Sequence, residues 1–178
     1  MFEKLEMRLS GSGGQGIVLA SIIFADAALQ GGLNVVQTQS FGPEARGGAS
    51  KSEVIISKDN IKYPMVTKPD VLLALTQKSY EKYVSDLGKD AILVVDEGVE
   101  VNGVAPAKVY QLPIIKTAHE RIGKSIVTNI VSIGALYNII AKDLIDLASM
   151  KKAIANRVPP AFVDLNIQAF EEGIKLTV

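Results

Sequence analysis

The sequence predicts an α/β protein of three layers, in which a mixed, mostly parallel sheet carries helices on both faces and the C-terminal third is helical. Three observations predict this fold. A glycine-rich loop separates a short strand from an apolar helix, two continuous apolar runs of strand length follow, and apolar residues recur at helical spacing beyond Pro113. The chain has 178 residues, 48% of them hydrophobic, so one domain spanning residues 1–178 with a single substantial core is expected.

The first third of the chain predicts strand, loop and helix, followed by two more strands. Glu6–Leu9 is expected to be a strand, the glycine run a tight loop, and Ile17–Gln30 a helix that ends at a pair of glycines. Further strands are expected at Asn34–Gln39 and Ser52–Ser57. Because the connection between these two is about as short as a parallel crossover allows, they are expected to pair antiparallel.

The middle of the chain predicts buried strands at Asp70–Leu75 and Ala91–Val95, with a helix around Lys78–Leu87 between them, because continuous apolar runs are typical of strands covered on both faces. An Asn-Gly pair between valines predicts a hairpin within Val99–Val104, ahead of a strand near Lys108–Leu112. Three further segments have helical spacing: Ser125–Ala141, Asp143–Asn156 and Asp164–Lys175.

The composition excludes several classes of function. Lysine plus arginine and aspartate plus glutamate both total 19, so no net charge attracts nucleic acid or an anionic membrane. The chain has no cysteine, which excludes disulfides, thiolate catalysis and cysteine-ligated iron-sulfur clusters, and the single histidine, His119, argues against a metal site. No signal peptide or membrane span is indicated, so the protein is expected to be cytoplasmic.

The glycine run is the first candidate site, with six candidate residues: Gly11, Ser12, Gly13, Gly14, Gln15 and Gly16. Its glycines match G-x-G-x-x-G between a strand and a helix, which is typical of Rossmann-like folds that hold a diphosphate at a helix N-terminus. A dinucleotide site also needs an acidic residue after the second strand, where this chain has Gln37–Ser40. Three interpretations stay open: another phosphate-bearing ligand, a dinucleotide, or close helix–strand packing alone.

Five other residues allow both functional and structural interpretations. Asp96-Glu97 end a predicted central strand, where α/β folds place functional carboxylates, although acidic residues also cap helices there. Asn129 and Asn138 are expected to bind a partner or neighbouring backbone, and His119 to be a solvated structural histidine. No catalytic residue is predicted on this chain.

Two loops together carry a family resemblance. The first loop is Arg8–Gly16, and the second is Ser40–Gly48, which contains the sequence Phe-Gly-Pro-Glu-Ala-Arg-Gly-Gly. Together they closely resemble the gamma subunits and gamma domains of 2-oxoacid:ferredoxin oxidoreductases. The resemblance continues through Asp70–Leu72, Val95-Asp96, Leu112-Pro113, Asn129 and Gly134-Ala135. The sequence of the second loop is most like that of the family members that act on 2-oxoglutarate. The beta subunit of indolepyruvate oxidoreductases is a close relative and is the alternative.

The resemblance implies a subunit that is inactive alone. In this family the alpha and beta subunits carry thiamine diphosphate, a ferredoxin-like delta subunit carries iron-sulfur clusters, and the complex converts a 2-oxoacid and coenzyme A (CoA) to an acyl-CoA. The gamma part packs against the others and is implicated in closing the site where CoA arrives. No cofactor is expected on this chain, and isolated copies are expected to be able to pair as a homodimer. A stand-alone Rossmann-type nucleotide-binding module and a purely structural subunit are the alternatives.

The second loop supplies the remaining candidate residues. The planar guanidinium of Arg46 suits a phosphate of CoA or a carboxylate of a partner, and a local ion pair with Glu44 is the alternative. The predicted subunit interface comprises Phe41, Pro43, Glu44, Arg46, Gly47 and Gly48.

Overall fold

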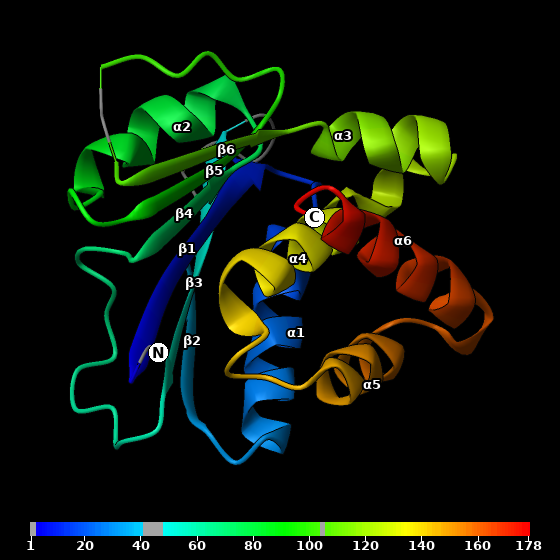
Figure 1. Ribbon diagram of the computed structural model, residues 1–178, viewed down its shortest axis with the longest axis horizontal. Coiled ribbons are helices and arrows are strands. Elements are labelled where there is room, and N and C mark those ends of the chain that lie inside the picture. The colour runs from blue at the N-terminus through cyan, green and yellow to red at the C-terminus, as the bar shows by residue number, and fades with distance from the viewer. Residues whose placement is uncertain (1–2, 41–47, 104–105) are drawn as a thin grey trace.

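The computed structural model describes residues 3–40, 48–103 and 106–178 and shows a twisted sheet with helices on both faces (Figure 1). The sheet has six strands in the order β2-β3-β1-β4-β5-β6. Their bounds are β1 Lys4–Ser12, β2 Asn34–Ser40, β3 Ala49–Ser57, β4 Val71–Ala74, β5 Ile92–Asp96 and β6 Lys108–Leu112. The predicted three-layer α/β fold is therefore confirmed.

The sheet is mixed because β3 runs against both of its neighbours. β1, β4, β5 and β6 are parallel to one another, whereas β3 pairs antiparallel with β1 and with β2. The expected antiparallel pairing after the second loop is thus confirmed. Its register sets Arg8 of β1 directly opposite Glu53 of β3.

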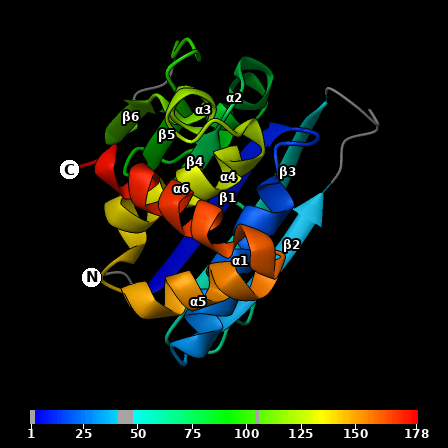
Figure 2. The same cartoon turned by 90° about the vertical axis from the view of Figure 1, so that its right-hand side faces the viewer.

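One face of the sheet is covered by most of the helices, as Figures 1 and 2 show. α1 (Ile17–Gln30) lies on β1, β2 and β3, and its bounds are those expected from the sequence. α4 (Thr128–Leu136) and α5 (Leu147–Arg157) pack against α1, and α6 (Val163–Lys175) packs across α4. Alternate residues of β1 are buried beneath them with side chains from α1 and α6, including Leu5, Met7, Leu9, Phe24 and Phe170.

The opposite face is covered by α2 (Gln77–Tyr83) and the single 3₁₀ turn η1 (Val84–Asp86). Thr76 begins α2 through a capping box, since its hydroxyl accepts from the Ser79 N–H at 3.3 Å and the Ser79 side chain accepts from the Thr76 N–H. A second, smaller core forms here from Leu72, Leu93, Val95, Tyr80 and Tyr83.

The predicted hairpin at Val99–Val104 is wrong over its described part, since residues 99–103 form no strand and β6 lies parallel to β5. Gly103 does turn the chain, with φ +78°. However, side chains of α2 take the backbone groups that a hairpin would pair. The Glu100 N–H donates to Gln77 at 2.8 Å, and the Tyr80 hydroxyl both donates to the Asn102 carbonyl (2.7 Å) and accepts from its N–H (3.0 Å).

The helical C-terminal third is more divided than its periodicity predicts. The segment Ser125–Ala141 begins as the 3₁₀ turn η3 (Ser125–Val127), continues as α4 and ends in a π turn, η4 (Tyr137–Ala141). α5 begins at Leu147 instead of Asp143, because the Asp146 carboxylate caps it by accepting from the Ser149 N–H at 2.8 Å. Short helical turns complete the chain: α3 (Ile114–Lys116), η2 (Thr117–Arg121) and η5 (Pro160–Phe162).

α4 and α6 cross so closely that two glycines meet. A Cβ added at Gly134 would lie 2.0 Å from the Phe170 carbonyl oxygen, and one added at Gly173 would lie 2.1 Å from the Val131 carbonyl oxygen. The crossing therefore depends on both glycines. Among the described residues, none of the helices is both long enough and apolar enough to span a bilayer.

Candidate functional site

The glycine turn at the end of β1 is shorter than the sequence predicts. Gly11 and Ser12, expected in the loop, belong to β1 and pair with Ser50 and Ala49 of β3. Gln15 explains the extension: its side-chain oxygen accepts from the Ser12 N–H at 2.7 Å, and its own N–H donates to the Ser12 carbonyl at 3.2 Å. Only residues 13–16 form the turn, and we call them the glycine turn.

The glycines of the motif have different physical roles. A Cβ at Gly11 would lie 2.5 Å from the Gln15 side-chain oxygen, so Gly11 makes room for the group that closes the turn. Gly14 and Gly16 have φ of +92° and +70°, which disfavours any other residue. Gly13 has a negative φ and no described atom within 4 Å of an added Cβ, so neither packing nor backbone strain requires it.

The N-terminus of α1 opens onto the glycine turn. The Gly16 carbonyl accepts from the Ala20 N–H at 3.0 Å and from the Asn129 amide of α4 at 3.2 Å, which fixes the turn to a second helix. Asn129 thus binds backbone of its own chain, as one of its two expected roles requires, but that backbone is 113 residues away in the sequence. Among the described residues no side chain caps α1, and its first turn has no acidic residue. The arrangement favours an anionic group there, because the first amides of a helix lack intrahelical acceptors.

Gln37, in the middle of β2, directs its side-chain amide toward the interior. The Gln37 side chain donates to the hydroxyls of Ser21 (3.1 Å) and Ser52 (2.9 Å), which are themselves 2.6 Å apart, and both serines are fully buried. This hydrogen-bonded group joins β2 and β3 to α1. The side-chain amide of Gln37 is therefore hydrogen-bonded within the protein instead of being directed at a ligand.

Most of the second loop lies outside the described residues. This applies to Phe41, Pro43, Glu44, Arg46 and Gly47, whose proposed contacts with CoA or with a partner stay predictions. Gly48 is described and is buried immediately before β3.

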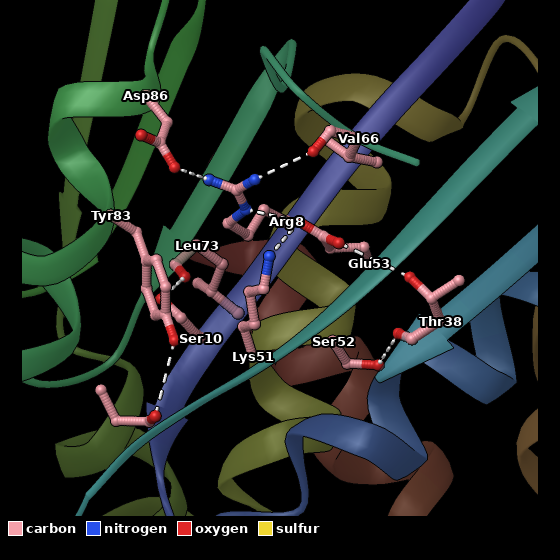
Figure 3. Close-up of polar contacts among 11 residues, drawn as sticks. Arg8, Ser10, Thr38, Lys51, Ser52, Glu53, Val66, Leu73, Tyr83 and Asp86 are labelled. Carbon is pink, nitrogen blue, oxygen red and sulfur yellow. Dashed lines mark hydrogen bonds and ion pairs between the residues drawn. The ribbon is translucent and has the colours of Figure 1, made fainter. Parts of the chain in front are cut away.

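The sequence interpretation missed a buried ionic cluster on the α2 face of the sheet, drawn in Figure 3. The Arg8 side chain is 3% exposed and uses all of its nitrogens. Its Nε donates to Glu53 at 2.7 Å, one terminal nitrogen pairs with Asp86, and the other donates to the Val66 carbonyl at 3.1 Å. Arg8 thereby ties β1 to β3, to η1 and to the segment that precedes β4.

Two more side chains complete the Arg8 cluster. Lys51 pairs with the same Glu53 oxygen at 2.9 Å. The Tyr83 ring lies against the cations, its centroid 5.6 Å from the Arg8 guanidinium and 6.0 Å from the Lys51 nitrogen. The sequence held one signal for this cluster, a charged residue between the apolar Met7 and Leu9 of the predicted first strand.

Two of the other candidate polar residues, Asp96 and Asn138, have structural partners. One oxygen of Asp96 accepts from the Ile115 N–H at 2.8 Å and the other from the Gly98 N–H at 3.1 Å, so Asp96 caps a turn. The Asn138 amide donates to the Thr177 hydroxyl at 2.9 Å, and His119 is exposed. No group of three or more metal-ligating side chains occurs in the described ranges.

The fold and the glycine turn define the class of protein: a Rossmann-like α/β domain with an uncapped helix N-terminus at the end of its first strand. Similarity to known proteins defines the class further. The family model of the pyruvate ferredoxin/flavodoxin oxidoreductases matches residues 6–176. This chain belongs to that family.

Three similar proteins illustrate the relationship. The 2-oxoglutarate synthase subunit KorC of Methanocaldococcus jannaschii is 45% identical, over 96% of this chain and 92% of that subunit. The crystal structure of the keto/oxoacid ferredoxin oxidoreductase gamma subunit from Geobacter sulfurreducens is 41% identical, with a TM-score of 0.86 over 98% of this chain and 96% of that one. A 2-oxoglutarate:ferredoxin oxidoreductase structure from Magnetococcus marinus, with 2-oxoglutarate, CoA and succinyl-CoA bound, has a TM-score of 0.89 at 24% identity, over 99% of this chain but 31% of that chain.

Proposed function

We propose that this chain is the gamma-type subunit of a 2-oxoglutarate:ferredoxin oxidoreductase. The complex decarboxylates the 2-oxoacid oxidatively, joins the acyl group to CoA and passes two electrons to ferredoxin. Thiamine diphosphate belongs to the alpha and beta subunits in this proposal, and the iron-sulfur clusters belong to a delta-type subunit, because this chain has no cysteine to ligate them.

The observation that carries the proposal is the 45% identity to a 2-oxoglutarate synthase subunit along nearly the whole of both chains. The 41% identity to a gamma subunit of known structure supports it. The Magnetococcus marinus chain, of which this fold spans 31%, supports the idea that the fold works as one part of a larger enzyme.

We place the contribution of this chain to CoA binding at its two loops. The uncapped start of α1 provides helix amides suited to a phosphate, and Arg46 supplies a forked donor. The glycine turn is held by Gln15 and Asn129, so it needs little reorganisation when an anionic group arrives. The second loop, from Phe41 to Gly48, is the expected contact with the alpha and beta subunits.

Reconstitution with the partner subunits tests the function. The complete complex is expected to reduce ferredoxin when given 2-oxoglutarate and CoA, with lower kcat/KM for pyruvate and for indolepyruvate. A complex lacking this chain should lose that activity, and the chain alone should show none. Equal activity without this chain would contradict the proposal, whereas a preference for indolepyruvate would favour the indolepyruvate oxidoreductase alternative.

The CoA contact needs a separate measurement. Arg46→Ala in the assembled complex is expected to raise the KM for CoA about tenfold or more while the KM for 2-oxoglutarate is unchanged, because a charge-assisted contact to phosphate is lost. Arg121→Ala is the matched control, since Arg121 is 60% exposed on η2 and pairs with Glu172 of α6. If both variants keep the wild-type KM for CoA and assemble normally, Arg46 has no role in CoA binding.

A titration addresses the nucleotide-binding alternative. The isolated chain is expected to bind NAD and FAD no better than about millimolar, because the end of β2 offers no acidic residue and Gln37 is turned inward. Isothermal titration calorimetry measures this directly. A micromolar affinity for either dinucleotide would replace the subunit proposal with the stand-alone module.

A further inference from the structure

A half-open apolar groove of about 440 Å³ lies beside the glycine turn. Three parts of the chain form it: the first turn of α1 at Leu19, the stretch Lys124–Asn129 that leads through η3 into α4, and Arg157–Asn166, which runs from the end of α5 to the first turn of α6. Figure 2 faces the side of the molecule on which these helices meet. The groove is built from three separate segments, so it is a feature of the tertiary fold.

Two large apolar side chains of this groove face solvent. Ile126 is 82% exposed and Phe162 is 53% exposed. Both line the groove, together with Leu19 and Pro159. Aromatic and aliphatic side chains concentrated around a concave surface are typical of protein-binding sites.

The walls of the groove are held in place before any partner arrives. Pro159 and Pro160 restrict the backbone of the α5–α6 connection, and the Asn166 amide donates to the Phe162 carbonyl at 2.8 Å. On the other wall Asn129, which lines the groove, is bound to the Gly16 carbonyl. A preformed groove binds with a smaller loss of conformational entropy.

The charge at the rim indicates the chemistry of the occupant. The charged side chains among the described lining residues are Lys124 and Arg157, and both are basic and exposed. Arg157 pairs with Asp26, using Nε and one terminal nitrogen, whereas Lys124 makes no ion pair with any described residue. Because Asp26 compensates Arg157, Lys124 supplies the positive charge at the rim, and an apolar floor beside this cation complements a segment that presents an apolar side chain next to a carboxylate.

We propose that this groove docks a partner subunit of the oxidoreductase complex, through a segment of that subunit carrying an aliphatic or aromatic side chain flanked by an acidic residue. The inference rests on the proposed function and locates a subunit contact at residues other than those of the second loop. Ile126 and Phe162 supply the apolar contact and Lys124 the charge contact. Since Asn129 both lines the groove and holds Gly16, docking here also braces the glycine turn.

Assembly of the complex from purified subunits tests this docking. Ile126→Asp is expected to raise the dissociation constant of this chain for its partners at least about tenfold, because it places an unpaired charge in the apolar contact. Lys124→Glu should weaken assembly about threefold to tenfold at low salt and reduce its salt dependence. Leu29→Asp is the matched control, since Leu29 is 65% exposed and lies ten residues from Leu19, about 15 Å further along α1.

The outcomes separate this inference from the proposed function. Failure of the wild-type chain to join any oxidoreductase subunit would overturn the proposed function itself. Assembly of wild type, Ile126→Asp and Lys124→Glu with equal affinity, while thermal unfolding is unchanged, would overturn the groove proposal alone. A wild-type homodimer that Ile126→Asp dissociates, with assembly unaffected, would overturn it too, because the groove would then join two copies of this chain.

Discussion

Replacing Gly134 by alanine tests how the C-terminal helices are held together. The added Cβ would lie 2.0 Å from the Phe170 carbonyl oxygen and 2.9 Å from the Gly173 Cα. An ordinary carbon–oxygen contact needs about 3.3 Å, so α4 and α6 must separate by roughly 1.3 Å at their crossing. Both obstacles are backbone atoms, and no side-chain rotation can relieve them.

The expected change in unfolding free energy for Gly134→Ala follows from two opposing effects. Overpacking of this kind costs about 3 kcal/mol, because separating the helices also loosens the Tyr137–Phe170 ring contact, whose centroids are 5.5 Å apart. Alanine gains about 1 kcal/mol over glycine in helix propensity. We expect Gly134→Ala to lose about 2 kcal/mol of unfolding free energy, which lowers the Tm by about 4–8 °C for a chain of this size.

Urea unfolding followed by circular dichroism measures this loss. Gly88→Ala is the control, because its added Cβ meets no described atom within 4 Å, and it should change stability by less than about 0.5 kcal/mol. Gly173→Ala should resemble Gly134→Ala, since it meets the same crossing from the other helix. Wild-type or higher stability for Gly134→Ala would refute the close helix crossing.

Three further predictions address other parts of the fold. Arg8→Met should lower the free energy of unfolding, measured in urea, by about 3 kcal/mol, because it leaves Glu53 buried without its main partner. The double variant Arg8→Met with Glu53→Met should be more stable than Arg8→Met alone. Thr76→Ala should cost about 1 kcal/mol by removing the cap of α2, in the same assay. Hydrogen bonds from Lys175 and Arg121 lower the pKa of Glu172 from its ordinary 4.5, so the stability they contribute is present above that pH and is lost as pH falls through the folded-state pKa.

A specific result would contradict each of these three predictions. A double variant at Arg8 and Glu53 as unstable as Arg8→Met would show that the cost is one of packing instead of an unpaired charge. A Thr76→Ala protein as resistant to urea as the wild type would remove the capping argument. Glu172→Gln should unfold less steeply with acid below about pH 4.5 than the wild type, and identical acid profiles would contradict the shift.

The sequence predicted those features that depend on local pattern. Ile17–Gln30 has the predicted bounds because the apolar run lies between Gly16 and the pair Gly31-Gly32, which determine the two ends of α1. The antiparallel β2–β3 pairing followed from the length of the second loop alone. The hairpin prediction failed because Gln77 and Tyr80, distant in sequence, bind the backbone that a hairpin would have used.

The candidate site was only partly predictable for the same reason. Motif spacing located the glycine turn, but not that Gln15 would extend β1 through Ser12. The sequence shows Arg8 as a charged residue between Met7 and Leu9, yet its partners Glu53 and Asp86 follow from strand register and from the position of η1. Periodicity reports which face a residue occupies and does not report which residue lies opposite it.

The position of β3 between β1 and β2 has a consequence for redesign. Adjacent strands lie about 4.8 Å apart, so the end of β2 is about 10 Å from the glycine turn, with β3 in between. In dinucleotide-binding folds the glycine loop and the ribose-binding acid stand on neighbouring strands. An acidic residue engineered at Ser40 would therefore lie one strand too far from the glycine turn. Converting this domain into an NAD enzyme would require a different strand order in its sheet.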